Sequence, residues 1–193
     1  MIACSRRSTV PLILAVLAAA VAVARAATAW VPPGPTVGNT FPNPLALEDQ
    51  AGNRQELKGL LGHRGAAVFF VRSADWCPFC KGQLKDVNGR LVDFKALGYT
   101  VVSVSMDTVD KIAAFHREQS IGYTMLSDPQ GAIVEKLGIR DTQYADGSEA
   151  YGVARPMIFV VDLQFRITHK YAEESYRNRP DLNRVLADLR QRQ

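Results

Sequence analysis

Cysteine is scarce in this sequence, with three residues among 193, at positions 4, 77 and 80. So few cysteines exclude a small scaffold held together by a network of disulfides. Internal repeats, low-complexity tracts and long blocks of charge are also missing, which excludes repeat solenoids and argues against a disordered chain. With 47% hydrophobic and 22% charged residues, the sequence predicts one globular domain with a substantial core.

The N-terminal segment has the pattern of an export signal. Arg6 and Arg7 form a positive start, residues 10–23 are apolar without a charge, and Ala24-Arg25-Ala26 offers a cleavage site. The apolar run is shorter than the roughly 20 residues that span a bilayer, although an uncleaved membrane anchor is the alternative. We therefore predict a signal peptide over 1–26 and an exported protein, in the bacterial periplasm.

The basic character of the chain belongs largely to this segment. The full sequence has 23 basic and 19 acidic residues. Removing residues 1–26 takes away Arg6, Arg7 and Arg25, which leaves 20 basic against 19 acidic residues, or +1. Such a balance gives no support for nucleic-acid binding or for an anionic membrane surface as a partner.

The remaining sequence alternates strand-like and helix-like segments. Residues 27–44 are rich in proline and glycine and predict an extended lead-in, so the folded domain is expected over 45–193. Short apolar runs predict buried strands, and apolar residues three or four apart predict amphipathic helices. The last two strands are close enough for an antiparallel hairpin, so we predict an α/β fold with a central mixed sheet flanked by helices. The expected strands are 46–54, 66–71, 100–105, 123–126, 157–161 and 165–171, and the expected helices are 77–94, 109–119, 130–137 and 182–189.

Two cysteines stand at the junction of a buried strand and a helix, in the segment Trp76-Cys77-Pro78-Phe79-Cys80. Two intervening residues place both sulfurs on the first helical turn, close enough to form a disulfide. The first cysteine lies at the helix N-terminus, where free backbone N–H groups and the helix dipole favour a thiolate. Pro78 occupies the first helical position, where its missing N–H costs nothing. The pattern predicts a redox-active dithiol.

Other readings of the two cysteines are less favourable. A structural disulfide would close too short a loop to stabilise the fold much. A zinc site would need two more ligands, and the three histidines, His63, His116 and His169, do not pair at metal-ligand spacing. Two idle buried cysteines would leave the neighbouring Trp76 and Pro78 without a purpose.

The dithiol segment after an apolar strand resembles the active site of the thioredoxin superfamily. Within it, the sequence from Val37 to the C-terminus is similar to the redoxin branch, which includes the AhpC/TSA proteins (peroxiredoxins). Leu126-Ser127-Asp128-Pro129 before a short helix, and Gly138-Ile139 after it, carry this second likeness. The resemblance implies a thioredoxin-like fold and a Cys77–Cys80 redox disulfide that works without an organic cofactor or a metal. It also implies that Pro156 is the family's cis-proline facing the dithiol, although a trans proline leading a strand is the alternative.

One departure from the peroxiredoxin pattern affects the expected activity. Peroxiredoxins carry a proline and a threonine or serine seven and three residues before the reactive cysteine, where this chain has Phe70 and Ala74. Because the hydroxyl would bond the peroxide, its loss favours thiol-disulfide exchange with other proteins. A peroxiredoxin-like thiol peroxidase, an antioxidant enzyme that reduces hydroperoxides through Cys77, is the alternative. Arg72 or Arg155 could supply a cation to either reaction, although a surface charge is the simpler interpretation of each.

We therefore predict an exported thiol-disulfide oxidoreductase in which Cys77 attacks and Cys80 resolves the mixed disulfide. Its partners would be protein thiols and disulfides, together with an upstream thiol protein that donates or accepts electrons. Residues expected to support the substrate groove are Trp76, Pro78, Phe79, Arg155 and Pro156. The sequence does not indicate the direction of electron flow, because that depends on the relative stability of thiolate and disulfide.

Overall fold

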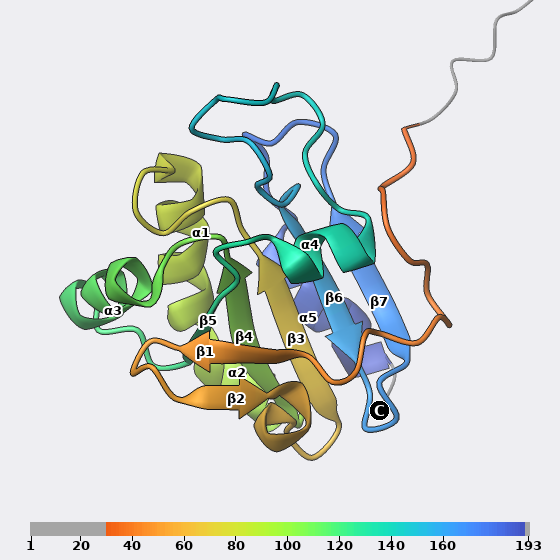
Figure 1. Ribbon diagram of the computed structural model, residues 1–193. Coiled ribbons are helices and arrows are strands. Elements are labelled where there is room, and N and C mark those ends of the chain that lie inside the picture. The colour runs from red at the N-terminus through yellow and green to blue at the C-terminus, as the bar shows by residue number, and fades with distance from the viewer. Residues whose placement is uncertain (1–29, 192–193) are drawn as a thin grey trace, which may run out of the picture.

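A mixed seven-stranded β-sheet with helices on both faces forms the centre of the molecule (Figure 1). The computed structural model describes residues 30–191, so the predicted signal peptide lies outside the described residues. The strands lie in the order β2-β1-β5-β4-β3-β6-β7. This arrangement confirms the predicted fold class. The strands are β1 (Ala46–Asp49), β2 (Arg54–Glu56), β3 (Gly65–Phe70), β4 (Tyr99–Ser105), β5 (Thr124–Ser127), β6 (Met157–Val161) and β7 (Ile167–Ala172).

The strands at the centre of the sheet are those with continuous apolar sequences. Every residue of β3 and of β6 is buried, as expected for strands that are covered on both faces. β3 pairs in parallel with β4 and antiparallel with β6, and β4 pairs in parallel with β5. The carboxyl ends of β3, β4 and β5 therefore lie side by side. This row of strand ends is called an edge of the sheet below, and it is where the candidate active site lies.

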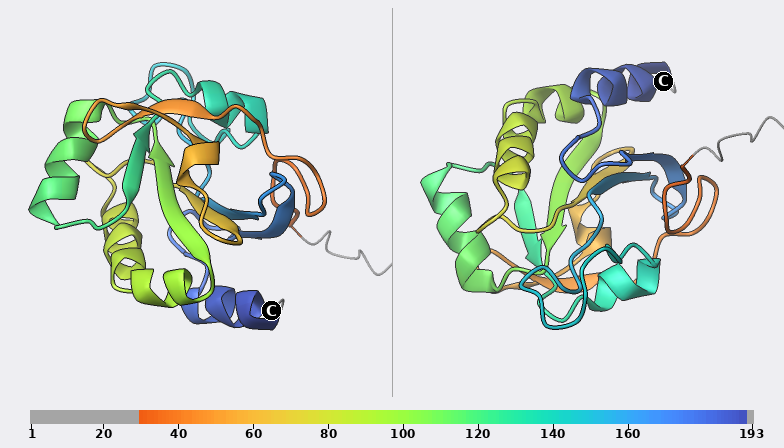
Figure 2. Two further views of the ribbon diagram at one scale, coloured as in Figure 1. Left: turned by 90° about the horizontal axis from the view of Figure 1, so that it is seen from below. Right: turned by 90° about the horizontal axis from the view of Figure 1, so that it is seen from above.

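Helices cover the two faces of the sheet unequally (Figure 2). One apolar cluster joins the sheet to α1, α2, α3 and α5, with Leu84, Phe94, Phe115 and Leu186 among its buried side chains. The cluster on the other face packs the sheet against α4 and against the segment before β3. The helices are α1 (Pro78–Asn88), α2 (Leu91–Ala96), α3 (Val109–Glu118), α4 (Ala132–Leu137) and α5 (Leu182–Gln191), with a 3-10 turn η1 (Leu57–Leu60) after β2.

Two expected elements are divided in the structure. The helix expected to continue to Phe94 stops at Asn88, because Gly89 caps it and Arg90 leaves the helical conformation at φ −112° and ψ 9°. A second helix, α2, then begins. The strand expected over 46–54 is a hairpin of β1 and β2, whose turn is held by backbone N–H donation from Ala51 and Asn53 to the Asp49 carboxylate.

The lead-in runs alongside β7, which is the outermost strand on one side of the sheet. Backbone N–H groups of Gly38 and Phe41 donate to the carbonyls of Ile167 (2.8 Å) and Phe165 (2.7 Å). Covering the edge strand in this way satisfies backbone groups that would otherwise be open to pairing with another chain. The predicted β6–β7 hairpin is confirmed as antiparallel. No helix within residues 30–191 is long and apolar enough to cross a membrane.

Candidate active site

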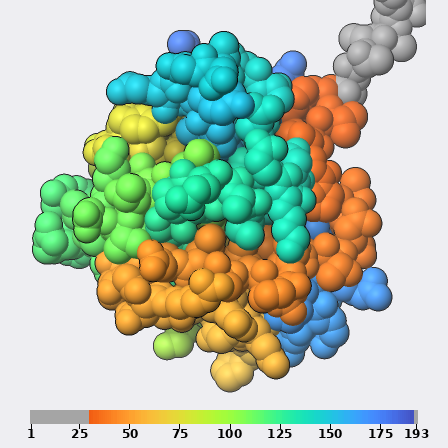
Figure 3. Space-filling view, in the orientation of Figure 1, coloured from red at the N-terminus to blue at the C-terminus, as the bar shows by residue number. Residues whose placement is uncertain are grey.

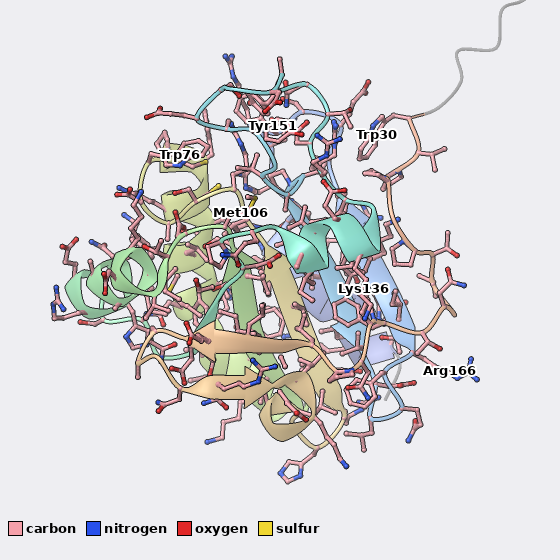
Figure 4. The ribbon with its side chains drawn as sticks, in the orientation of Figure 1. Trp30, Trp76, Met106, Lys136, Tyr151 and Arg166 are labelled. Carbon is pink, nitrogen blue, oxygen red and sulfur yellow. The ribbon has the colours of Figure 1, made fainter. Side chains whose placement is uncertain are left out.

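The dithiol lies at the edge of the sheet where the parallel strands end. Phe70, the last residue of β3, pairs with Val104 of β4 on one side and with Met157 of β6 on the other. The chain from β3 into α1 therefore leaves the sheet beside the start of β6. Figure 4 shows Trp76, Met106 and Tyr151 gathered at this end of the molecule. In α/β sheets the carboxyl ends of parallel strands are the usual place for a site.

Cys77 and Cys80 are free thiols on the first turn of α1. Cys77 is the N-cap residue, and its Sγ accepts a hydrogen bond from the backbone N–H of Cys80 at 3.4 Å. Pro78 occupies the first helical position, as predicted. The two residues are 1% and 0% exposed. The strand-to-helix junction thus presents both sulfurs inside the protein rather than on its surface.

The two thiols influence each other's ionisation. The hydrogen bond from the Cys77 thiol lowers the pKa of Cys80 to about 6, with smaller contributions from the backbone of Ser73 and from the Arg179 guanidinium. The same hydrogen bond, together with burial, raises the pKa of Cys77. The Cys77 hydrogen bond and the Arg179 guanidinium therefore favour a thiolate on Cys80, whereas the helix N-terminus was expected to favour it on Cys77.

A buried arginine near the dithiol follows the end of β3. Arg72 is 5% exposed, and its guanidinium lies over the rings of Trp76, Tyr144 and Tyr176 at 4.9, 4.8 and 4.4 Å. It also donates to the hydroxyl of Tyr144 at 2.7 Å. The three rings come from three separate segments of the chain, and Arg72 contacts all of them. Arg72 and these three rings are called the roof of the site below. Its positive charge acts to lower the pKa of Cys77.

The loop between α4 and β6 contributes one ring, that of Tyr144, to this roof. In the space-filling view this loop, in cyan, covers the end of the sheet beside the yellow start of α1 (Figure 3). The loop carries Tyr144, and the segment between β7 and α5 carries Tyr176. Phe79 packs edge-on against Tyr176 with ring centroids 6.2 Å apart. Trp76 and Phe79 are 39% and 42% exposed, so the roof has an aromatic outer surface.

A buried carboxylate holds the loop that leads to Cys77. Asp107, just after β4, accepts hydrogen bonds from the Ser73 hydroxyl at 2.6 Å, the Ala74 backbone N–H at 2.6 Å and the Ser105 hydroxyl at 2.8 Å. The Ser73 hydroxyl in turn accepts from the backbone N–H groups of Asp75 and Trp76. Ser73 is therefore fully engaged in the loop and does not replace the peroxide-binding hydroxyl that Ala74 lacks.

Two predicted supporting residues lie differently from expectation. The side chain of Arg155 pairs with Asp141 at 3.8 Å and lies 5.0 Å from the ring of Trp30, which Figure 4 shows well apart from Trp76. Pro156 is buried at the start of β6, at the same sheet edge as the dithiol. The cis peptide bond among residues 30–191 precedes Pro44 instead. The prediction of a cis bond before Pro156 is wrong.

The path of the chain into β6 explains why the bond before Pro156 is trans. Arg155 donates its backbone N–H to the carbonyl of Ile139 at 2.7 Å, and Ala154 forms a bridge with Arg140. The chain is thus already extended before it reaches Pro156. A trans bond continues this direction into the strand.

Four participants in the site were not predicted from the sequence: Asp107, Tyr144, Tyr176 and Arg179. A signal for Asp107 was available, because it follows the buried strand β4, which pairs with β3, and so belongs to the same sheet edge. Tyr144 and Arg179 lie in irregular segments far along the chain, and no local pattern indicates that they reach the dithiol.

Comparison with known proteins agrees with this geometry. The model of the AhpC/TSA family matches residues 37–170. A putative peroxiredoxin of Mycobacterium tuberculosis is 32% identical over 118 residues, covering 61% of this chain and 73% of the relative. Peroxiredoxin Bcp of Escherichia coli is 24% identical over 138 residues, covering 72% of this chain and 86% of the relative.

Solved structures share the fold. Peroxidoxin BcpB from Mycobacterium tuberculosis superposes with a TM-score of 0.69 at 24% identity, over 80% of this chain and 96% of that one. Peroxiredoxin Q from Xanthomonas campestris gives 0.65 at 21% identity, over 83% and 96%. With a dithiol at the expected strand-to-helix junction and a family match over most of its described residues, the chain belongs to the AhpC/TSA family of peroxiredoxin-like redox enzymes.

Proposed function

We propose that this protein is a thiol peroxidase that reduces small hydroperoxides with the Cys77–Cys80 dithiol. The observation that carries the proposal is the burial of both sulfurs, which are 1% and 0% exposed beneath the Arg72 roof. A hydroperoxide is small enough to enter such a site, whereas a disulfide on a folded partner would require the roof to open. The names of the relatives support the same chemistry.

The reaction uses the two cysteines in sequence. The Cys77 sulfur, once deprotonated, attacks the outer oxygen of the peroxide, the O–O bond breaks, and Cys77 becomes a sulfenic acid while an alcohol or water leaves. Cys80 then attacks the Cys77 sulfur, forming the disulfide and releasing hydroxide. An external dithiol protein then reduces the disulfide by exchange and is itself oxidised, and this last step is the one that requires the roof to open. The cycle requires no organic cofactor or metal.

Because Ala74 has no hydroxyl to bond the peroxide, the scheme relies on the charge of Arg72, which acts on the attacking Cys77 sulfur. Arg72 lowers the pKa of Cys77 and so increases the fraction of thiolate available for attack. A peroxide without a hydroxyl partner is held less firmly, so we expect saturation only at high peroxide concentration.

The test is hydrogen peroxide consumption with dithiothreitol as the reductant. The unmodified protein should consume peroxide faster than the reductant alone, and Cys77→Ser should fall to that background. Cys4→Ser is the matched control, because Cys4 lies in the predicted signal peptide, and it should retain full activity. Equal rates for the unmodified protein and Cys77→Ser would refute the proposal.

A second candidate is disulfide exchange with partner proteins, which the exposed aromatic rings beside the dithiol favour. Trp76 and Phe79 present apolar surface to solvent, and a groove of about 780 Å³ is lined in part by Phe79, Gln83 and Arg177. Reduction of insulin disulfides separates the two functions. Rapid insulin reduction without peroxide turnover would make exchange the activity, and the reverse result would support the peroxidase.

We also propose that the protein acts after export to the bacterial periplasm. The support is the sequence of residues 1–26, with its two arginines, apolar run and small-residue cleavage site. Mass spectrometry of protein recovered from a bacterial periplasmic fraction should give a mature N-terminus near Ala27. Recovery of a chain that still begins at Met1 would contradict cleavage, and its presence in the membrane fraction would identify the segment as an anchor.

A further inference from the structure

Cys80 has a charged partner that the reaction described above does not use. Nη2 of Arg179 donates to the Sγ of Cys80 at 3.2 Å, across 99 residues of sequence. The other terminal nitrogen, Nη1, donates to the backbone carbonyls of Tyr176 and Asn178, the latter at 2.8 Å. The guanidinium is therefore fixed by the backbone of its own segment and aimed at the sulfur.

No carboxylate competes for this guanidinium. Between residues 30 and 191, none of the salt bridges includes Arg179. Its Nε is buried without a partner. Arg179 is partly buried, and a guanidinium withdrawn from water is favoured by a nearby anion, because an unpaired charge is costly to desolvate. The group that can become an anion within reach here is the Cys80 thiol.

We propose that Arg179 is a positioning residue that keeps the negative charge of the dithiol on Cys80 until the disulfide forms. Cys80 is then first the base that takes the proton from Cys77, and afterwards the nucleophile that closes the disulfide. The reaction sequence rests on the peroxidase function proposed above, whereas the contact between Arg179 and Cys80 does not.

Arg72 and Arg179 act on different sulfurs. Arg72 lies over the aromatic rings and acts on Cys77, while Arg179 touches Cys80 directly. The charged and titratable groups facing the pair are these two arginines and Tyr144, in addition to the thiols themselves. A cation within hydrogen-bonding distance typically lowers the pKa of an acid by about 1 to 3. The lowered pKa of Cys80 agrees in direction with this geometry.

The proposed reaction conserves atoms, electrons and charge. The resting state is the Cys77 thiol hydrogen-bonded to the Cys80 thiolate. As Cys77 attacks the peroxide, its proton passes to Cys80 and from there to the departing alkoxide or hydroxide, so Cys80 is a thiolate again beside the Cys77 sulfenic acid. Cys80 then forms the S–S bond and hydroxide leaves. Two electrons pass from the dithiol to the peroxide, and the disulfide carries no charge.

The first experiment measures the pKa of Cys80 without activity. In a Cys77→Ser background, the thiolate absorbance of Cys80 is followed against pH, with and without Arg179→Gln. We expect the midpoint to move upward by about 1 to 3 pH units when Arg179 is replaced. Arg177→Gln is the matched control, because Arg177 is an exposed arginine of the same segment that contacts Tyr176 rather than a sulfur. The control should leave the midpoint unchanged.

Two further variants distinguish an effect of the Arg179 charge from a general structural effect of replacing the side chain. Arg179→Lys keeps a cation and should move the midpoint less than Arg179→Gln does. Arg179→Met, which keeps an unbranched stem, replaces the glutamine variant if the latter does not fold. A Cys80 midpoint that is the same with arginine, lysine and an uncharged residue at position 179 would overturn the proposal.

The second experiment follows the resolving step in the chain with both cysteines. In Arg179→Gln, a larger fraction of the oxidised Cys77 should be trapped by dimedone as sulfenic acid, and a smaller fraction recovered as the disulfide, than in the unmodified protein. Unchanged trapping would overturn the role of Arg179 in resolution. If the protein does not turn over peroxide but the Cys80 midpoint still depends on Arg179, the proposed function fails while the Arg179 contact stands.

Discussion

The apolar interior of the sheet and its polar edge are built from different kinds of residue. In the interior, β3 and β6 are buried over their whole length and contain no polar side chain. At the edge where β3, β4 and β5 end, the buried residues include Arg72, Ser73, Asp107, Ser127 and Asp128. Apolar burial is the main source of stability. Buried polar groups cost free energy unless they are paired, so their concentration at one edge marks the place where chemistry is positioned.

The largest expected loss of stability comes from a substitution in the apolar interior. Phe69 is fully buried and packs edge-on against Phe94 with ring centroids 6.1 Å apart. Phe69→Ala should lower the free energy of unfolding by about 3 to 5 kcal/mol, because it opens a cavity in the core. Urea denaturation measures this loss, and Val92→Ala, at an exposed position, should change it little. The peroxide turnover of the folded fraction should be unaffected, so a proportionate loss of turnover would contradict the separation of the two regions.

A slightly smaller loss of stability is expected at the polar edge, together with a loss of chemistry. Asp107→Ala leaves the donors of Ser73, Ala74 and Ser105 without their acceptor. We expect a loss of about 2 to 4 kcal/mol and a fall in peroxide turnover, because the loop before Cys77 loses its support. Asp110→Ala, at an exposed position nearby, is the control in the same two assays. Full turnover by Asp107→Ala would show that the loop does not depend on this carboxylate.

Removing the charge of the roof should affect chemistry more than stability. Arg72→Gln removes the cation that lowers the pKa of Cys77. A pKa increase of about one reduces the thiolate fraction about tenfold, so the peroxide rate should fall by about that factor at neutral pH. Arg64→Gln is the matched control, because Arg64 also lies over a tyrosine ring, that of Tyr99, but before β3 begins. An equal loss in both variants would mean that the roof acts only through packing.

The smallest predicted effect has the opposite sign. Gly82 is inside α1, and a Cβ added there meets no atom within 4 Å. Gly82→Ala should therefore stabilise the protein by about 0.5 to 1 kcal/mol, since alanine has the higher helix propensity. Gly65→Ala is the opposing control, because its Cβ would lie 1.8 Å from the carbonyl oxygen of Val161. Thermal denaturation should show the first variant above and the second below the unmodified protein.

The interior was predictable because its signals are local. The apolar run 66–71 predicts β3, and the spacing of Leu84 and Val87 predicts the buried face of α1. The dithiol was predictable for the same reason, since its two cysteines and Pro78 lie within one turn. The break of the helix at Gly89 was missed because an apolar pattern continues across it to Phe94.

The polar edge was less predictable because its contacts join distant segments. Arg72 and Arg155 were both candidates for the cation, but only the fold shows that Arg72 lies over three aromatic rings while Arg155 pairs with Asp141. Arg179 reaches Cys80 from a segment without helix or strand character, and only the packing of α5 and β7 brings it there. Such contacts depend on the completed fold rather than on periodicity.

The central claim is that buried Cys77 attacks hydroperoxides and Cys80 resolves the product. Intact mass spectrometry of reduced Cys80→Ser after one equivalent of hydrogen peroxide tests it most directly. The account predicts a single added oxygen on Cys77, trapped by dimedone, whereas the unmodified protein should lose two hydrogens and form the Cys77–Cys80 disulfide. An unmodified mass for Cys80→Ser, with both thiols still reduced in the unmodified protein, would contradict it.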